Sequence, residues 1–297
     1  MLVYVHFGSV RVAYRILAFM SGILYVVATP IGNLEDITYR AVRILGQVNW
    51  IACEDTRQTR KLLDHYGIQT PQVSYHEHNE IDRAKELCSR LLAGETGALV
   101  SDAGVPLISD PGYRLVHAAV ETGVVVQPVP GPSALLAALS ASGLPTDAFH
   151  FGGFLPPRGR QRVHALEALK SEAATLIFYE APHRIVEALA DIQAVLGDRD
   201  VVVAREITKI HEEFLHGTAS ELQAKLSARD SIKGEITLLV AKATRPIVDE
   251  RPIEVAVEEQ IRSGLSRMDA MKAVAKSRGL SKRDVYREFE HLPQVRR

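Results

Sequence analysis

Hydrophobic and polar positions alternate along the chain in a pattern that predicts two successive α/β units. In the first, short runs rich in Val, Ile and Ala indicate strands, and the segments between them carry the three-to-four-residue spacing of helices. Strands are expected at 23–29, 48–53, 72–76, 97–101 and 124–129, and helices at 34–47, 55–66, 79–93, 111–122 and 130–143. This alternation predicts a mainly parallel sheet covered by helices.

A second alternation of the same kind follows. Strands are expected at 150–154, 175–180, 201–205, 212–217 and 235–241, with helices at 158–170, 182–196 and 218–228. The stretch "SASGLPTDA" separates the two alternations. We therefore expect a first α/β domain at 23–143 and a second at 144–243, with a cleft between them.

The last part of the chain, 250–297, has a different pattern. "ATRPIVDERP" is typical of a linker, and residues 253–290 show three short helical patterns and no strand. Between Arg262 and Arg287, eight Lys and Arg residues stand against two acidic ones. Lys276, Lys282 and Arg283 are candidate RNA contacts, and an ordinary solvated helical pair is the alternative. A small core is expected from Met268, Met271, Ala275, Leu280, Val285 and Phe289.

Composition limits the class of protein. Of the 297 residues, 46% are hydrophobic and 24% are charged, which is typical of a globular protein. The net charge of −1 means that any nucleic-acid binding must use a local basic patch. Two cysteines suit a reducing cytoplasm and are too few for a disulfide framework, and no apolar run is long enough for a membrane span. Residues 1–22 are expected to be a poorly ordered extension, with Met20 as an alternative start.

The stretch "SDAGVPLISDPG" follows a predicted strand and combines two aspartates, two glycines and two prolines. Ligands of open α/β sheets bind beyond the carboxyl ends of strands, where glycine permits close approach and proline restricts the loop. This pattern is compatible with a ligand-binding loop. The alternative is an ordinary turn in which Asp102 and Asp110 cap helices.

Other loops carry weaker signals. "VATPIGNLEDIT" has a single glycine, so the dinucleotide-binding fingerprint is absent. "GPSALL" offers backbone N–H groups at a helix start that could hold a polar ligand, although the segment taken alone favours a plain N-cap by Ser133. "HEHN" is typical of a polar loop, and no metal site is predicted.

Acidic and basic residues crowd together in "CEDTRQTRKLL". In one interpretation Glu54 and Asp55 cap a helix, while Arg57, Arg60 and Lys61 are solvated. In the other, the carboxylates and the arginines face the cleft and bind a ribose or a phosphate.

Six segments taken together resemble a known family. "LYVVATPIGNLEDIT", "CEDTRQTRKLL", "SDAGVPLISDPG", "PGPSALLAAL", "FYEAPHRI" and "AREITKIHEE" are similar, in the same order, to the ribosomal RNA small subunit methyltransferase I family. That family belongs to the tetrapyrrole-methylase superfamily. The resemblance covers about 23–290 and implies two α/β domains with S-adenosylmethionine (AdoMet) bound between them, and a small helical segment after them.

The resemblance also implies an activity and a set of site residues. The activity is 2′-O-methylation of a cytidine ribose at the decoding centre of small-subunit (16S) rRNA, by a cytoplasmic homodimer. The residues implied to line the AdoMet site are Pro30, Ser101, Asp102, Ala103, Ile108, Ser133, Ala134, Tyr179 and Ile207.

Methyl transfer to a ribose hydroxyl needs a group that accepts the hydroxyl proton or stabilises the charge. Four candidates stay open: Glu54, Asp55, Glu180 and Lys209. Two other functions are also compatible with the sequence, namely a tetrapyrrole C-methyltransferase and a non-catalytic RNA-binding factor. The first has no use for a basic tail, and the second is not expected to bind AdoMet.

Overall fold

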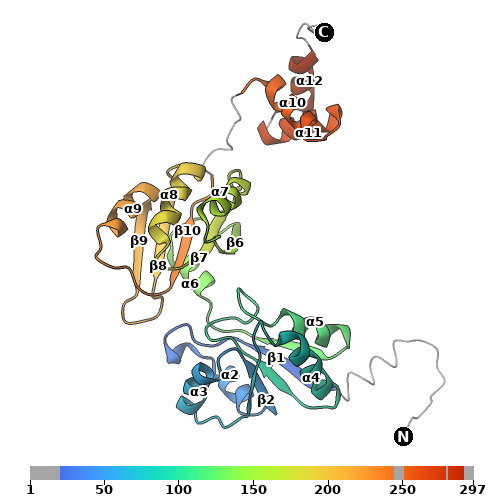
Figure 1. The fold of residues 1–297 in the computed structure, drawn as a ribbon, viewed down its shortest axis with the longest axis vertical. Coiled ribbons are helices and arrows are strands. Elements are labelled where there is room, and N and C mark those ends of the chain that lie inside the picture. Colours follow the sequence, from blue (N-terminus) through green and yellow to red (C-terminus); the bar gives the residue numbers. More distant parts are fainter. Residues whose placement is uncertain (1–20, 244–250, 279, 291–297) are drawn as a thin grey trace, which may run out of the picture.

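The computed structural model describes residues 21–243, 251–278 and 280–290. The predicted extension therefore lies almost entirely outside the described residues, as do the linker at 244–250 and the last residues of the tail. Figure 1 shows two α/β units one above the other, and a group of helices that follows them in the chain.

The first sheet is parallel throughout, as the alternation predicts. Its strands lie in the order β3-β2-β4-β1-β5, and every neighbouring pair is parallel. They are β1 (Ile23–Val27), β2 (Trp50–Cys53), β3 (Gln72–Ser74), β4 (Gly97–Leu99) and β5 (Val125–Val129). Because all strands run the same way, the loops that follow them meet at one edge of the sheet.

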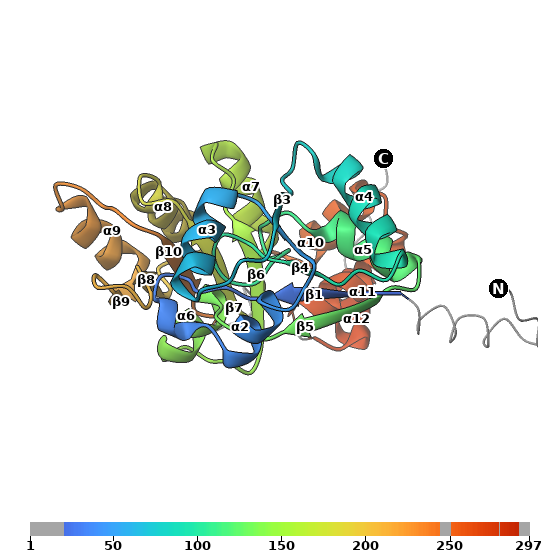
Figure 2. The same ribbon diagram turned by 90° about the horizontal axis from the view of Figure 1, so that it is seen from below.

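Helices cover both faces of this sheet (Figure 2). On one face of the sheet, the strands share a hydrophobic core with the helix residues Leu45 and Leu63. On the other face, they share a second core with Leu87 and Leu115. The helices on the first face are α2 (Tyr39–Leu45) and α3 (Thr56–His65), and a short 3₁₀ helix, η1 (Leu34–Asp36), precedes them. On the second face lie α4 (Glu80–Leu92) and α5 (Tyr113–Glu121). Both faces are thus closed, and the loop edge is the place left for a ligand.

The second sheet is mixed. Its order is β6-β7-β10-β8-β9, and only β6 and β7 are parallel, whereas the other three pairs are antiparallel. The strands are β6 (Phe149–Phe154), β7 (Thr175–Glu180), β8 (Asp200–Arg205), β9 (Glu213–Thr218) and β10 (Ile236–Val240). A short turn joins β8 to β9 as an antiparallel pair, and β10 then enters the centre of the sheet.

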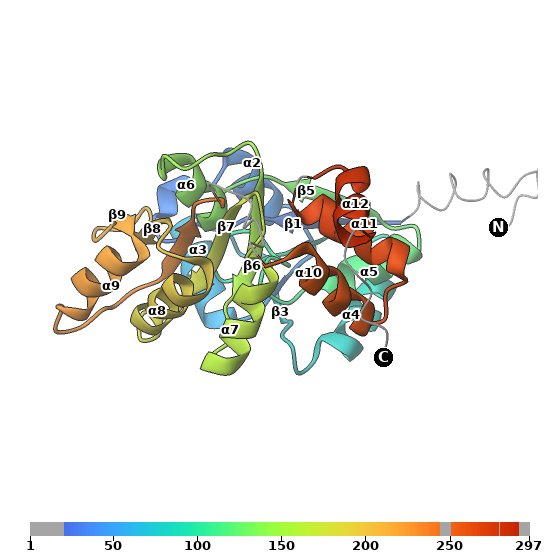
Figure 3. The same cartoon turned by 90° about the horizontal axis from the view of Figure 1, so that it is seen from above.

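Alternate residues of this sheet face two different helical layers, as expected for strands buried on both sides. Leu176 and Phe178 face α7 (Gly159–Ala168), α8 (Ile185–Leu196) and α9 (Ala219–Ser227), which are grouped in Figure 3. Ile177 faces α6 (Ala134–Ala141). Helix α6 follows a strand of the first sheet but packs on the second, so it lies across the two units. The predicted division at residues 143 and 144 stays a prediction.

The tail contains the expected short helices: α10 (Ile253–Arg262), α11 (Arg267–Arg278) and α12 (Lys282–Glu290). Its core includes Met271, Ala275 and Val285, with Phe289 packed against it. The prediction that Met268 and Leu280 join this core is wrong, because they are 56% and 42% exposed. Ile253 and Val257 of α10 contribute instead. No helix in the described part of the chain is long and apolar enough to cross a membrane.

Candidate active site

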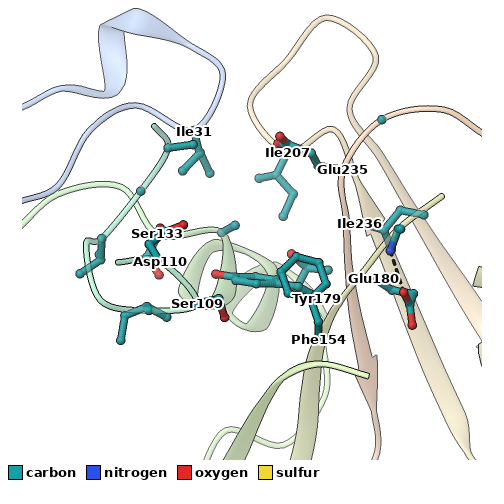
Figure 4. Close-up of a pocket in the computed structure, with 18 of the residues that line it drawn as sticks. Ile31, Ser109, Asp110, Ser133, Phe154, Tyr179, Glu180, Ile207, Glu235 and Ile236 are labelled. Atoms are coloured by element: carbon teal, nitrogen blue, oxygen red, sulfur yellow. Dashed lines mark hydrogen bonds between the residues drawn. The ribbon is translucent and has the colours of Figure 1, made fainter. Parts of the chain in front are cut away.

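A cavity of about 370 Å³ lies between the two sheets, at the loop edge of the first (Figure 4). Its volume falls in the range of about 300–1,000 Å³ that is usual for small-molecule sites. Both α/β units contribute to it. From the first come Ile31, Ala103, Gly104, Val105, Ile108, Ser109, Asp110, Ser133 and Ala134, and from the second Phe154, Tyr179, Glu180, Ala181, Pro182, Ile207, Gly234, Glu235, Ile236 and Thr237.

The first wall of the cavity is the loop 101–112 that follows β4. Gly104 pairs with Thr29 through two backbone hydrogen bonds of 2.9 and 3.0 Å, which tie this loop to the one after β1. Gly104 has a φ of 84°, and an added Cβ would lie 3.3 Å from Ile31. Leu107 and Ser109 adopt φ values of 71° and 66°, which are uncommon for residues with side chains. Such strain persists only where the surroundings fix the backbone, and it often occurs at ligand sites.

The second wall is aromatic. The ring of Tyr179 lies 5.0 Å from that of Phe151 and 5.7 Å from that of Phe154, measured between centroids. The pairing of β6 with β7 shifts register between Phe151 and Phe154, where Gly153 takes a φ of 64°. This bulge brings Phe154 to the cavity. Burial raises the pKa of Tyr179, and its hydroxyl oxygen accepts a hydrogen bond from the Leu135 amide at the start of α6.

The two walls touch on both sides of the cavity. On one side, a Cβ placed on Gly153 would lie 3.6 Å from Ser109 Oγ. On the other side, the Thr208 hydroxyl donates a hydrogen bond to Asp36, and the Lys209 side chain occupies the space that a Cβ on Gly32 would need. The turn after β8 is therefore closely fitted to the loop after β1.

Asp110 contributes a carboxylate to the first wall. Burial, followed by the nearby charges of Glu54 and Asp102, raises its pKa to about 6, although a hydrogen bond with Ser101 acts in the opposite direction. The alternative interpretation, in which Asp110 caps a helix, is wrong, because α5 begins at Tyr113 with Gly112 as its N-cap. The sequence alone shows that this loop contains the aspartate, but it does not show that the aspartate lines the cavity. Its position depends on the left-handed backbone conformations of Leu107 and Ser109.

Glu180 contributes the carboxylate of the opposite wall. Its side chain is 0% exposed and forms a 2.6 Å ion pair with Arg184 through Oε1, which also accepts a 2.8 Å bond from the Ala181 amide. Its second oxygen, Oε2, is buried and has no hydrogen-bond partner in the protein. The carboxylate is therefore held by the fold through one oxygen, and its other oxygen is buried without a hydrogen-bond partner.

Six of the nine predicted cofactor residues line the cavity: Ala103, Ile108, Ser133, Ala134, Tyr179 and Ile207. Pro30, Ser101 and Asp102 do not. Ser101 is buried and donates to the Ala103 and Gly104 carbonyls, so it shapes the loop from behind. Asp102 accepts a 3.2 Å bond from the Asp55 amide. Ser133 is also the N-cap of α6, so the helix-cap interpretation holds for it as well.

The cluster after β2 lies outside the cavity lining. Asp55 is the N-cap of α3, and its carboxylate accepts 3.1 and 2.8 Å bonds from the Arg57 guanidinium. These bonds lower the pKa of Asp55 to about 2. The helix-cap interpretation is thus confirmed for Asp55. Burial, followed by repulsion from Asp102 and Glu77, raises the pKa of Glu54.

The remaining predicted residues also lie away from the cavity lining. Lys209 Nζ is 2.8 Å from Glu206 and 3.0 Å from Glu235. Burial lowers the pKa of Lys209, but these two carboxylates outweigh it, so the pKa is raised. Arg60 lies 4.0 Å from Asp64. The other candidate RNA contacts are exposed at positions Lys61, Lys276, Lys282 and Arg283.

The cavity residues fit AdoMet chemically. Aliphatic and aromatic side chains such as Ile31, Phe154 and Tyr179 offer surfaces for a nucleoside base, and Asp110 offers negative charge for a cationic ligand. Small residues at Ala103 and Gly104 leave the backbone accessible. Among the described residues, no group of His, Cys, Asp or Glu side chains is arranged to hold a metal ion.

Solved structures share this fold. A crystal structure of diphthine synthase matches with a TM-score of 0.59 at 15% identity, over 75% of this chain and 92% of that one. Uroporphyrin-III-C-methyltransferase from Thermus thermophilus matches with a TM-score of 0.53 at 19% identity, over 74% of this chain and 94% of that one. At these identities, the two matches show a shared fold only. The family model for tetrapyrrole (corrin/porphyrin) methylases matches residues 23–223, so the chain belongs to that family.

Sequence relatives narrow the assignment. The ribosomal RNA small subunit methyltransferase I of Halalkalibacterium halodurans is 51% identical over 273 residues, which cover 89% of this chain and 93% of that protein. The protein of the same name from Bacillus subtilis is 45% identical and covers 92% and 95%. Within the tetrapyrrole methylases, the chain is a member of the ribosomal RNA small subunit methyltransferase I family.

Proposed function

We propose that this protein transfers a methyl group from AdoMet to a cytidine 2′-hydroxyl in small-subunit (16S) rRNA. The observation that carries the proposal is the cavity formed by loops of both α/β units, in a chain whose family match covers both. The names of relatives at 45% and 51% identity favour rRNA over a tetrapyrrole as the substrate. They also favour an enzyme over a non-catalytic RNA-binding factor.

The cofactor is proposed to lie between the two walls. Ala103, Ser133 and Ala134 would contact it from the first wall, and Tyr179 and Ile207 from the second, because all five line the cavity. AdoMet supplies a methyl group that is activated by a positive sulfonium. The contribution of the protein is to bind and orient the reactants, which can lower a barrier by up to about 7–11 kcal/mol.

Asp110 is the group that we propose to accept the ribose proton. A general base works best when its pKa lies near the working pH, and Asp110 combines a pKa of about 6 with a place in the cavity. As the hydroxyl oxygen takes the methyl group, its proton would pass to the Asp110 carboxylate. Ser101 and the charges of Glu54 and Asp102 act on that carboxylate.

The four earlier candidates are less suited to this role. Asp55 is held by Arg57 and has a pKa of about 2, so it is a weak base. Lys209 is kept protonated by two carboxylates. Glu180 forms a buried pair with Arg184. Glu54 does not line the cavity, and its charge is proposed to act through Asp110 instead.

RNA binding is proposed to involve the tail and the cluster after β2, through Arg57, Arg60 and Lys61 and through Lys276, Lys282 and Arg283. Exposure of these side chains supports the proposal. A cytoplasmic homodimer is proposed from the family resemblance. Exposed apolar residues on edge strands β5 and β6, Val125 and Phe149, are compatible with an interface.

Two measurements test the proposed function. The purified protein should bind AdoMet in a calorimetric titration and transfer a labelled methyl group to small ribosomal subunits or to free 16S rRNA. Mapping ribose methylation in a strain that lacks the gene should show one unmodified cytidine, restored by the wild-type gene. AdoMet binding without methylation of either RNA substrate would contradict the proposed substrate, and absence of AdoMet binding would contradict the proposed cofactor.

A further inference from the structure

Two arginines with no assigned task lie where the turn after β6 enters α7: Arg158 is the N-cap of α7, and Arg160 is in its first turn. Arg158 and Arg160 are both exposed. Within residues 21–243, 251–278 and 280–290, neither side chain has an ion-pair or hydrogen-bond partner. Other cations near the cavity are paired: Arg184 with Glu180 and Lys209 with Glu206. An exposed guanidinium without a partner is free to bind an external anion.

The fold fixes this turn at the mouth of the cavity. Phe154, the last residue of β6, lines the cavity, and Leu155 is 2% exposed and belongs to the core of the second unit. Pro156 and Pro157 follow and restrict the backbone up to the start of α7 at Gly159. Because β6 and β7 are parallel, the turn lies at the same edge of the sheet as the cavity residues Glu180 and Ala181.

The neighbouring part of the mouth is acidic. Gly153 of the β6 bulge approaches Ser109, so β6 meets the loop after β4 and not the loop after β1. That loop carries Asp102 and Asp110, and the charge of Glu54 acts on Asp110. This side of the mouth therefore has carboxylates on the first wall and unpaired arginines on the second.

We propose that Arg158 and Arg160 bind backbone phosphates of the RNA strand beside the target nucleotide, an inference that rests on the proposed rRNA substrate. Phosphates would be repelled by the carboxylates and attracted to the arginine turn, whose planar guanidinium groups match phosphate geometry. A ribose hydroxyl is a hydrogen-bond donor, so it is drawn to the acidic wall. The opposite charges of the two walls thus set which way the strand lies across the cavity.

The test compares two double variants with the same change in charge. Arg158→Ala/Arg160→Ala removes the turn's cations. Lys170→Ala/Lys225→Ala removes two exposed lysines from the far end of α7 and from α9. Binding of small subunits is measured at several salt concentrations, together with KM and kcat for methylation and the calorimetric affinity for AdoMet.

We expect the arginine variant to raise the KM for subunits at least tenfold and to leave AdoMet affinity within twofold. Each lost phosphate contact reduces the salt slope of binding by about 0.7 on single-stranded RNA, so the slope should fall by about 1.4. Arg158→Lys/Arg160→Lys should restore most of the slope, because it keeps the charge. The lysine control should change none of these quantities.

Two outcomes overturn the inference. One is an arginine variant whose KM and salt slope match those of the wild type. The other is a fall in AdoMet affinity or kcat at unchanged KM, which would mean that the arginines pair with Asp102 or Glu54 when the cavity closes. Failure of the proposed function is distinguishable, since in that case the wild type itself would not methylate the subunits.

Discussion

Asp110 on the first wall of the cavity and Glu180 on the second are both carboxylates, and the fold treats them differently. Glu180 is fully buried and paired with Arg184, so the second wall neutralises its acid. Asp110 is partly buried among Ser101, Glu54 and Asp102, so the first wall provides a hydrogen bond but leaves its charge without a neighbouring cation. The comparison indicates that a carboxylate's environment, and not its presence in the pocket, separates a structural role from a chemical one.

The largest expected effect follows from removing the charge of Glu180. Glu180→Gln would leave the Arg184 guanidinium buried without its partner, which typically costs about 3–5 kcal/mol. We expect a clear loss of thermal stability, measured by circular dichroism. Replacing both partners, as Glu180→Gln/Arg184→Met, should recover much of it. A stable Glu180→Gln protein with methylation reduced a hundredfold would instead show that Glu180 acts in the chemistry.

Asp110→Asn should lower the rate of methylation and not the stability of the fold. The amide keeps the shape but cannot accept the proton, so single-turnover methylation should fall by about 10²-fold, the usual scale of general-base help. Calorimetric affinity for AdoMet should change little. Asp55→Asn serves as the control, because that carboxylate lies outside the cavity lining, and it should retain most of its methylation rate. Equal losses in the two variants would remove Asp110 from the chemical step.

The same substitution should stabilise the fold. The pKa of Asp110 is raised on folding, from 3.8 to about 6, so its contribution to stability is fully present below about pH 3.8 and is lost as pH rises through 6. At pH 7.5 the ionised group is therefore unfavourable, by about 1 kcal/mol after allowance for screening. Asp110→Asn should melt roughly 2 °C higher at pH 7.5, and the difference should vanish near pH 4. A lower melting temperature at pH 7.5 would contradict this.

The pH dependence of methylation provides a smaller test. If Asp110 is the base, single-turnover rates should be constant above about pH 7 and should fall about tenfold between pH 7 and pH 5, because the carboxyl group becomes protonated. Glu54→Gln removes one of the charges that raise this pKa, so it should move the midpoint to lower pH. If Glu54→Gln leaves the midpoint unchanged, the pH dependence of methylation does not report the titration of Asp110.

The backbone of the first wall can be tested through Gly104. Gly104→Val places a branched side chain at a φ of 84° and 3.3 Å from Ile31, so AdoMet affinity should weaken about tenfold or more, roughly 1.4 kcal/mol. Gly143→Val is a matched control, since Gly143 has a φ of 72° and open space around its Cβ position. Unchanged AdoMet affinity in a folded Gly104→Val protein would show that this loop is not part of the cofactor site.

The smallest expected effect concerns the helical tail. Deleting residues 244–297 removes the exposed Lys276, Lys282 and Arg283, so binding to small subunits should weaken severalfold and its salt slope should decrease. AdoMet affinity should stay the same, because the cavity lining contains no tail residue among the described ones. A truncated protein with the wild-type salt slope would show that the tail does not contact RNA.

Much of the fold could be predicted from residue patterns, because each strand and helix is marked by its own local sequence. The pairing of the second sheet could not, since nothing local to Ile236–Val240 indicates that this strand enters between β7 and β8. The prediction that Met268 and Leu280 are buried was wrong for a related reason. Which face of a short helix is buried depends on the helices packed against it, and the local sequence does not show these. The composition of the loop after β4 is compatible with ligand binding, and the loop lines the cavity. The position of Asp110 within that loop could not be predicted, because it depends on two residues with left-handed backbone conformation.

The place of β10 in the second sheet has a consequence for synthesis on the ribosome. Every strand of the first sheet is complete by Val129, so that unit can fold while translation continues. The second sheet cannot close in this way, because its central strand is the last to be made and joins β7 to β8. Until residue 240 has left the exit tunnel, the nascent chain has one wall of the cavity without the other. A chain released earlier would lack the complete cavity.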